Sequence, residues 1–236
     1  MKRLLLLSNS TDFGRGYLDH AIEAVRAHFA GVGRIAFVPF ALKDQAGYWA
    51  KVRDRLEAER IEVTRVTPDP CGYKVVESAD GVFVGGGNTF RLLRALRHSG
   101  LIELLRSLAL QGMPYMGASA GTNVAAPTIK TTNDMPIVEA GALDALDLVP
   151  FQINPHFVDV EGPRRHMGET REERLREYLE ENALPVVGLR EGAWLKVLGD
   201  RVRLEGANGA RIFRRGMSPS EWPEGTELTT RLEAAP

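Results

Sequence analysis

A chain of 236 residues with 44% hydrophobic residues has the size and apolar content of one α/β domain with an ordinary core. Its net charge of −1 argues against nucleic acid or an anionic membrane as the main partner, and its single cysteine, Cys71, excludes an internal disulfide and a multi-cysteine metal site. The apolar run at 4–7 is too short for a signal peptide, and no stretch approaches the roughly 20 apolar residues of a membrane span. We therefore expect a cytoplasmic protein.

The first half of the chain alternates between strand and helix signals. A continuous apolar run predicts a buried strand at 3–7, and further strands are predicted at 34–40, 61–66, 81–84 and 113–116. Apolar residues at helical spacing predict helices at 18–29 and 48–59, and over 92–108 either one helix broken at Gly100 or two helices. This order predicts a mostly parallel sheet between two layers of helices, a three-layer α/β/α sandwich, with ligand sites at the carboxyl ends of the strands.

The last quarter of the chain has a different pattern. Thr170 and Glu173 form a capping box that predicts a helix over 170–181. Short strands are predicted at 185–189, 193–198, 202–205 and 211–214, and they either extend the sheet in antiparallel fashion or form a small flap. Because no linker or repeat interrupts the chain, residues 1–236 are interpreted as a single domain, with a mobile tail after about residue 216.

The most informative motif is Gly-Ala-Ser-Ala-Gly at 117–121, which fits the G-x-S-x-G pattern of a nucleophile elbow. A serine on a tight strand-to-helix turn tolerates only small neighbours, and all four neighbours here are Gly or Ala. The helix that follows would place the N–H of Ala120 where an oxyanion forms. The alternative is a tight turn that only packs a helix on the sheet. The context of strand, small residues and helix onset favours Ser119 as a nucleophile.

A serine nucleophile needs a base, and the chain has five histidines. His20, His28 and His98 lie in helical stretches, and His166 lies in a charged loop, so these four are interpreted as surface or boundary residues. His156 differs, because it follows an apolar segment and a proline and is expected at the end of a strand. It is the candidate base, with a structural boundary histidine as the alternative.

Two carboxylates compete to orient that base. Asp134 lies in a polar turn soon after the elbow, and Glu191 lies just past the predicted strand at 185–189. Catalytic triads occur in several chain orders, so the order of these residues does not decide between them. We favour Glu191, since it and His156 are both expected at strand ends, and the third member of the triad stays open.

Two further features point to binding groups. The glycines at 85–87 lack the residues of a phosphate loop, but a glycine N–H approaches a tetrahedral intermediate without steric cost, and Asn88 is suited to cap the next helix. Arg171 lies in the first turn of a predicted helix, where the helix dipole disfavours a cation. It is either a surface arginine or part of a receptor for a carboxylate.

Taken together, these segments resemble the peptidase E family of α-aspartyl dipeptidases. The resemblance covers nearly the whole chain and is carried by LLLLSNST at 4–11, VGGGNTF at 84–90, GASAGTNVA at 117–125, PTIKTTNDMPIV at 127–138, ALDLVPFQINPHF at 145–157 and GETREER at 168–174. It implies a fold like that of class I glutamine amidotransferases, with serine in place of cysteine.

The resemblance also implies residue roles. It brings Ser119 as nucleophile and His156 as base, and both candidate acids, Asp134 and Glu191, lie in matching motifs. It further implies the N–H groups of Gly87 and Ala120 as oxyanion donors, and a substrate-binding role for Arg171, which would read an aspartate side chain, and for Asn88. Ala118 departs from the family, where an aromatic residue can occur, and this difference would alter a pocket wall.

The expected function is therefore a serine exopeptidase that cleaves Asp-X dipeptides, with no metal or cofactor. Its partner would be a small peptide, and the protein would be a monomer or a homodimer. The alternatives are a related hydrolase of another substrate, such as a cyanophycinase-like peptidase or an esterase, and a non-catalytic amidotransferase-like binding domain.

Overall fold

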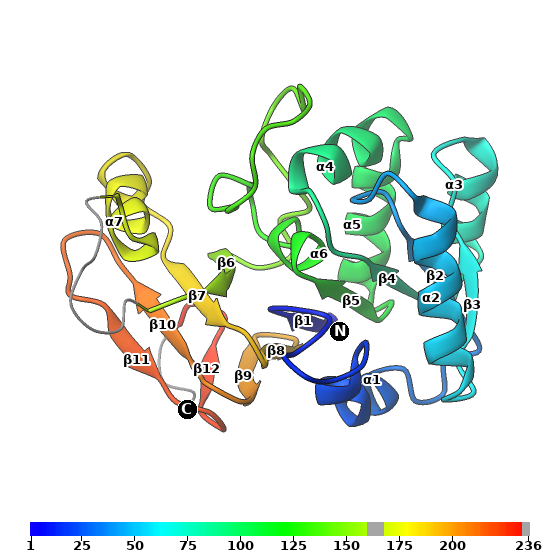
Figure 1. Cartoon of the computed structure of the whole chain (residues 1–236), viewed down its shortest axis with the longest axis horizontal. Helices are drawn as coiled ribbons and strands as arrows, with labels where there is room; N and C mark the ends of the chain where they lie inside the picture. Colours follow the sequence, from blue (N-terminus) through cyan, green and yellow to red (C-terminus); the bar gives the residue numbers. More distant parts are fainter. Residues whose placement is uncertain (160–167, 233–236) are drawn as a thin grey trace.

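The fold is seen in a computed structural model that describes residues 1–159 and 168–232. The larger sheet within these residues contains, in spatial order, β12 (Glu227–Thr229), β9 (Arg201–Gly206), β8 (Ala193–Leu198), β1 (Arg3–Leu7), β5 (Tyr115–Ala118), β4 (Gly81–Val84), β2 (Arg34–Val38) and β3 (Glu62–Arg65) (Figure 1). The neighbouring strands β1, β5, β4, β2 and β3 are parallel to one another, whereas β8, β9 and β12 pair in antiparallel fashion. The predicted mostly parallel sheet is confirmed.

Helices cover both faces of this sheet. Leu4 and Leu6 pack into one apolar core and Leu5 and Leu7 into the other, because successive strand residues point to opposite faces. The first core includes side chains of α3 (Pro70–Glu77), α4 (Thr89–His98), α5 (Leu101–Gln111) and α6 (Ala120–Asn123), and the second includes those of α1 (Ile22–His28) and α2 (Gln45–Glu57). The three-layer α/β/α arrangement implied by the amidotransferase-like resemblance is therefore confirmed.

The sequence does not predict α3, which packs on the same face of the large sheet as α4, α5 and α6. Asp69 caps it by accepting hydrogen bonds from the N–H groups of Cys71 and Gly72, and Pro70 occupies its first position. Gly72 packs against the backbone of Thr67 so closely that a Cβ atom would lie 1.8 Å from its carbonyl oxygen. The Pro-Cys-Gly sequence thus begins a helix, although the same residues are typical of a turn.

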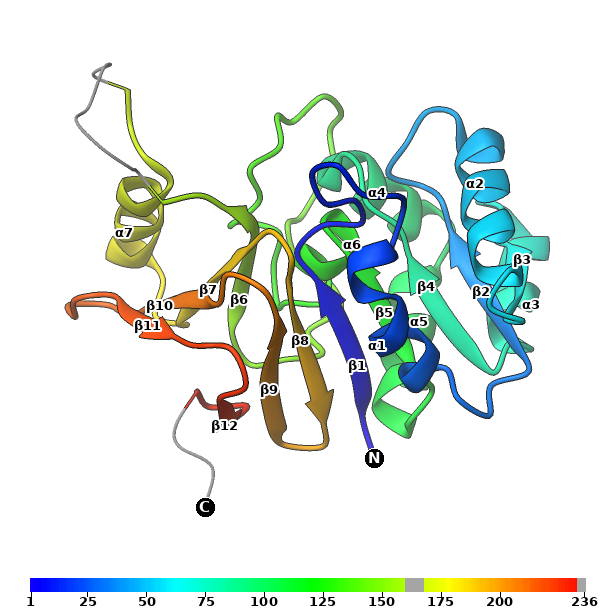
Figure 2. The same ribbon diagram turned by 60° about the horizontal axis from the view of Figure 1, so that its bottom comes forward.

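The remaining strands form a second, smaller sheet. Its order is β11 (Ser220–Trp222), β10 (Ala210–Phe213), β7 (Val186–Arg190) and β6 (Gln152–Phe157). The helix α7 (Arg171–Glu181), with the predicted capping box, lies beside this sheet (Figure 2). Its Leu175 and Leu179 side chains pack with Phe157, Val186 and Phe213 of the sheet. Both predicted alternatives for the C-terminal strands therefore occur, since β8 and β9 extend the large sheet while β7 and β10 belong to the small one. The strands β11 and β12, beyond residue 216, are not predicted.

The strands of the large sheet end level with one another. Leu7 is aligned with Ala118, and Val84 is aligned with both Gly117 and Val38. The residues after β1, β2, β4 and β5 therefore share one edge of the sheet, where ligand sites of parallel sheets lie. No helix in the described part of the chain is long and apolar enough to span a membrane.

Candidate active site

Ser119 occupies the turn between β5 and α6. Its backbone has φ 53° and ψ −110°, a conformation that residues other than glycine rarely adopt. Both flanking glycines are required by space, because a Cβ on Gly117 would lie 2.4 Å from the Gly121 oxygen and a Cβ on Gly121 would lie 2.0 Å from the Val84 oxygen. The strained turn projects Ser119 at the carboxyl edge of the sheet, the geometry of a nucleophile elbow.

His156 reaches Ser119 from the small sheet. Its Nε2 atom lies 2.8 Å from Ser119 Oγ, a hydrogen-bond distance at which a neutral imidazole accepts the hydroxyl proton. The residue sits in a β-bulge of β6, between Pro155 and Phe157, with φ 55°. A bulge redirects a side chain out of the regular alternation, and here it aims the imidazole at the nucleophile.

A buried serine fixes this backbone conformation. Ser8, the first residue after β1, is 0% exposed. Its hydroxyl accepts a hydrogen bond from the His156 N–H at 2.8 Å and donates one to the Leu189 carbonyl at 2.8 Å. Ser8 therefore joins the end of β1 in the large sheet to the neighbouring strands β6 and β7 of the small sheet, next to His156.

The structure brings Glu191, rather than Asp134, to His156. Glu191 Oε1 lies 2.6 Å from His156 Nδ1, so the ring joins Ser119 on one side to a carboxylate on the other. The backbone around Glu191 is held on both sides: Asn9 accepts a hydrogen bond from the Gly192 N–H, and Asn208 donates one to the Glu191 carbonyl. The arrangement fixes the tautomer that leaves Nε2 free to accept a proton.

Asp134 instead faces the start of α4. Its Oδ2 atom accepts hydrogen bonds from the Thr89 N–H at 2.7 Å and the Thr89 hydroxyl at 2.6 Å, and Thr132 Oγ1 lies 3.3 Å away. A carboxylate at a helix N-terminus is stabilised by the free N–H groups and by the helix dipole. Asp134 thus anchors the helix that follows the glycine loop.

The glycine loop packs directly against the elbow. A Cβ on Gly86 would lie 3.0 Å from the Ser119 Cβ, and Gly87 has φ 131°, which favours glycine. The Gly86 N–H donates to the Tyr48 hydroxyl at 2.9 Å. Within the described residues, the N–H groups of Gly87 and Ala120 have no acceptor, so both are available to a developing oxyanion.

The phenol that holds this loop is kept neutral by its surroundings. Tyr48 is buried on α2, and its hydroxyl lies 3.3 Å from the hydroxyl of Tyr17. Burial raises the pKa of Tyr48, and burial together with the neighbouring phenol raises the pKa of Tyr17 well above its ordinary value. Both phenols are therefore uncharged hydrogen-bonding groups at neutral pH.

A cavity of about 570 Å³ opens beside these groups. Its walls are the segment after β1, the start of α2, the Gly86–Gly87 loop, Ser119 and His156. This volume is in the range of small-molecule sites, roughly 300–1,000 Å³. Among the described residues no group of three or more His, Cys, Asp or Glu side chains is placed to hold a metal ion.

Arg171, the first residue of α7, is half-buried. Burial, with Arg174 adding to it, lowers the pKa of its guanidinium, while the charges of Glu191 and Asp134 oppose that shift. Its side chain has no hydrogen bond or ion pair with any residue that the structure describes. Asn88, in contrast, is occupied: it caps α4 through the Arg91 N–H and donates to the Met135 carbonyl.

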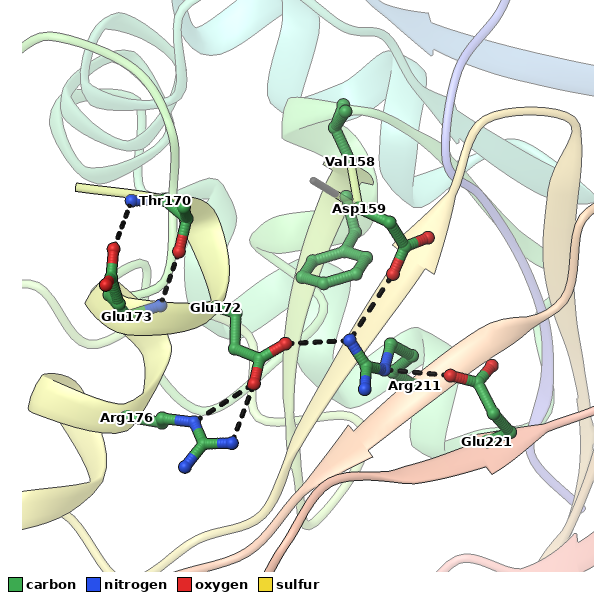
Figure 3. Close-up of a pocket in the computed structure, with 9 residues that line it drawn as sticks. Val158, Asp159, Thr170, Glu172, Glu173, Arg176, Arg211 and Glu221 are labelled. Atoms are coloured by element: carbon green, nitrogen blue, oxygen red, sulfur yellow. Dashed lines mark hydrogen bonds and ion pairs between the residues drawn. The ribbon is translucent and has the colours of Figure 1, made fainter. Parts of the chain in front are cut away.

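The start of α7 is held by a charge network, shown in Figure 3. Arg211 on β10 lies 2.7 Å from Glu172, 3.4 Å from Asp159 and 2.8 Å from Glu221. Arg190 pairs with Asp159 at 2.5 Å and holds the pKa of that carboxyl below its usual range. Because Glu172 follows Arg171 and Arg190 precedes Glu191, the network fixes the helix start relative to the strand that carries the carboxylate.

Sequence reasoning missed three supporting residues, Ser8, Asn9 and Tyr48. The first two form the polar pair directly after the apolar β1 run, and that abrupt change is the signal that could have marked them. Tyr48 carries no such signal, because its position on α2 is that of an ordinary core residue. Of the other histidines, His28 is buried rather than at the surface, and His166 lies outside the described residues.

The fold and the joined serine, histidine and carboxylate define a serine hydrolase. Residues 4–205 match the model of peptidase family S51, and the chain belongs to this family. The chain is 55% identical over 230 residues to peptidase E of Streptomyces coelicolor, covering 98% of this chain and 95% of the relative.

Two other comparisons agree with this assignment. The chain is 45% identical over 235 residues to a Drosophila melanogaster protein described as a "probable alpha-aspartyl dipeptidase", covering 98% of each. The crystal structure of a peptidase from an acI-B1 Actinobacterium has a TM-score of 0.74 at 16% identity and covers 97% of each chain, which shows a shared fold. The protein is thus a peptidase.

Proposed function

We propose that this S51 peptidase hydrolyses dipeptides with an N-terminal aspartate through an acyl-enzyme on Ser119. The observation that carries the proposal is the continuous hydrogen-bonded chain from Ser119 through His156 to Glu191, beside a cavity of dipeptide scale. The name of the Drosophila relative supports the substrate class.

In the proposed reaction, His156 Nε2 takes the hydroxyl proton as Ser119 Oγ attacks the peptide carbonyl carbon. The carbonyl oxygen becomes an oxyanion that accepts hydrogen bonds from the N–H groups of Gly87 and Ala120. The C–N bond then breaks, and His156 protonates the leaving amine. A water molecule, deprotonated by His156, attacks the acyl-enzyme. The bond between the acyl carbon and Ser119 Oγ then breaks, His156 returns the proton to Oγ, and free aspartate leaves.

The two carboxylates have separate parts in this scheme. Glu191 orients the ring of His156 and stabilises the imidazolium that forms during the reaction. Asp134 supports the glycine loop indirectly, because it anchors the α4 N-terminus two residues after Gly87. Because its hydrogen bonds go to Thr89 and Thr132 and not to Ser119 or His156, its role is one of positioning.

Arg171 is the proposed receptor for the aspartate side chain. The Arg171 guanidinium is half-buried, has no partner among the residues that the structure describes, and is influenced by the charges of Glu191 and Asp134. Such a group is suited to bind a carboxylate in bidentate fashion. An Asn-X substrate would place amide donors against the guanidinium donors and should react about 100-fold less efficiently. Asn88 contributes through the helix cap it makes.

The test compares Asp-Leu and Asn-Leu hydrolysis in wild type and three variants. Ser119→Ala should lose activity by roughly 10³-fold or more. Arg171→Ala should raise KM for Asp-Leu and reduce the Asp/Asn preference, whereas Arg174→Ala, an exposed arginine of the same helix, should do neither. Equal turnover of Asn-Leu by wild type, or full discrimination in Arg171→Ala, would remove the specificity proposal.

A cyanophycin assay and fluorophosphonate labelling complete this test. Cleavage of cyanophycin in place of Asp-Leu would assign a different substrate to the same triad. Failure of Ser119 to take the label, with no hydrolysis of either substrate, would contradict the acyl-enzyme mechanism.

We also propose that the enzyme works in the cytoplasm on small peptides, as a monomer or a homodimer and without a nucleic acid partner. The single Cys71 is free and exposed, which is suited to a reducing compartment. Cell fractionation with activity measurement, and light scattering of the purified chain, test these two points.

A further inference from the structure

The cavity beside Ser119 extends away from the triad to α2. Asp44, Tyr48 and Lys51, from the start of this helix, line it together with Ser119 and His156. Arg171 does not line it. A substrate whose aspartate side chain lies at Arg171 would therefore place its second residue, the leaving amino acid, in the cavity against α2.

Lys51 is a cation without a counter-ion on this wall. Its Nζ atom lies 4.7 Å from the centre of the Tyr17 ring, an arrangement that attracts an ammonium group to the ring face. Burial keeps the Tyr17 hydroxyl protonated, so the ring adds no negative charge. In the part of the chain that the structure describes, no carboxylate or other acceptor is paired with this ammonium group.

The other titratable side chains that line the cavity beside Asp44 and His156 are the buried phenols described above, and Asp44 and His156 are already engaged. Asp44 caps α2: its carboxylate accepts a hydrogen bond from the Gly47 N–H at 2.9 Å and lies at the positive end of the helix dipole. The His156 ring is held between Ser119 and Glu191. Lys51 is thus the cation that the described cavity wall offers to a ligand.

We infer that Lys51 binds the free carboxylate of the leaving amino acid, an inference that rests on the proposed function. In a dipeptide this carboxylate is attached to the carbon next to the scissile nitrogen, so it stays within a short distance of the carbonyl that lies at Ser119. A longer peptide carries an uncharged amide there, and its terminal carboxylate lies roughly 3.5 Å further along the chain. Lys51 would therefore make the enzyme favour dipeptides over peptides extended at the C-terminus.

The experiment compares Asp-Leu with its C-terminal amide, Asp-Leu-NH₂, which differs only in this charge. Wild type should hydrolyse Asp-Leu with a kcat/KM roughly fivefold or more above that of the amide, the effect of one partly exposed charge pair. Lys51→Met should raise KM for Asp-Leu by a similar factor with little change in kcat, and leave the amide almost unchanged. Lys51→Arg should keep the preference.

The matched control is Lys43→Met, which removes the same charge from the segment before α2 but outside the cavity wall. It should change neither substrate. The inference is overturned if Lys51→Met affects both substrates equally, if it affects neither, or if Lys43→Met reproduces its effect. Failure of the proposed function has a different signature, because wild type would then not cleave Asp-Leu at all, and this result would overturn the inference as well.

Discussion

Replacing Ser8 by alanine tests how the base is held. The change removes one buried hydroxyl that serves two backbone groups, the N–H of His156 and the carbonyl of Leu189, each at 2.8 Å. Neither group can turn to solvent easily, because Ser8 is 0% exposed and the surrounding strands are packed. An unsatisfied buried backbone group costs about 1–3 kcal/mol, so the free energy of unfolding should fall by about 2–4 kcal/mol after partial relaxation.

The activity of Ser8→Ala should fall by more than the loss of folded protein alone would cause. The His156 backbone has φ 55° and is kept there by its neighbours, of which Ser8 is the direct hydrogen-bond partner. A shift of about 1 Å in a catalytic group can cost roughly 100-fold, so kcat for Asp-Leu should drop by about that factor at a temperature where the variant is folded.

Urea unfolding and steady-state kinetics measure the two effects, with Ser218→Ala, an exposed serine, as control. If the free energy of unfolding of Ser8→Ala lies within about 0.5 kcal/mol of the wild-type value and kcat is unchanged, the hydrogen bonds of Ser8 do not position His156.

Three further predictions concern other supporting groups. Tyr48→Phe keeps the ring but leaves the Gly86 N–H without its acceptor, so kcat should fall roughly tenfold with a smaller change in KM; an unchanged kcat would contradict this role for the phenol. Glu191→Gln should reduce kcat by about 10²–10⁴-fold, whereas Asp134→Asn should mainly lower the melting temperature, and a reversed order would exchange the two roles. His28 is buried, and burial lowers its pKa to about 3, so the unfolded chain binds a proton that the folded chain refuses. The free energy of unfolding should therefore fall as pH drops from about 6.5 towards 3, and this slope should be smaller in His28→Gln; parallel pH curves for the two proteins would refute the assignment.

The sequence was sufficient for the features that depend on local pattern. The elbow at Ser119 follows from small residues at a strand end, and the capping box at Thr170 follows from residue spacing. The parallel sheet follows from the alternation of apolar runs and helical spacing. In each case the physical cause lies within a few residues of the feature.

The choice between Asp134 and Glu191 depends on contacts that no local pattern contains. Glu191 meets His156 because β6 and β7 pair in parallel with a bulge at His156, and the register of that pairing is set by tertiary packing. Asp134 lies in an equally polar turn but faces Thr89, 45 residues earlier in the chain. Two carboxylates with similar local surroundings thus differ only in what the fold places opposite them.

The second sheet was uncertain for a related reason. The strand patterns at 185–189 and 211–214 were visible, but strand partners are not encoded by alternation alone. The strands β11 and β12 are three residues each, too short to produce a periodic signal. The helix α3 was missed because proline and glycine at its start are typical of turns.

The proposed catalytic residues are divided between the two sheets. Ser119 directly follows β5 of the large sheet, whereas His156 lies in β6 and Glu191 directly follows β7 of the small sheet. The hydrogen bonds of the Ser8 hydroxyl are among those that join the two sheets. Proteins open locally in cooperative units whose free energies are smaller than that of global unfolding. If the small sheet opens as such a unit, the base leaves the nucleophile while the parallel core stays intact. On heating, peptide hydrolysis would then be lost at a lower temperature than the circular dichroism signal of the helices. The loss of activity would report on the less stable of two folding units and not on the whole chain.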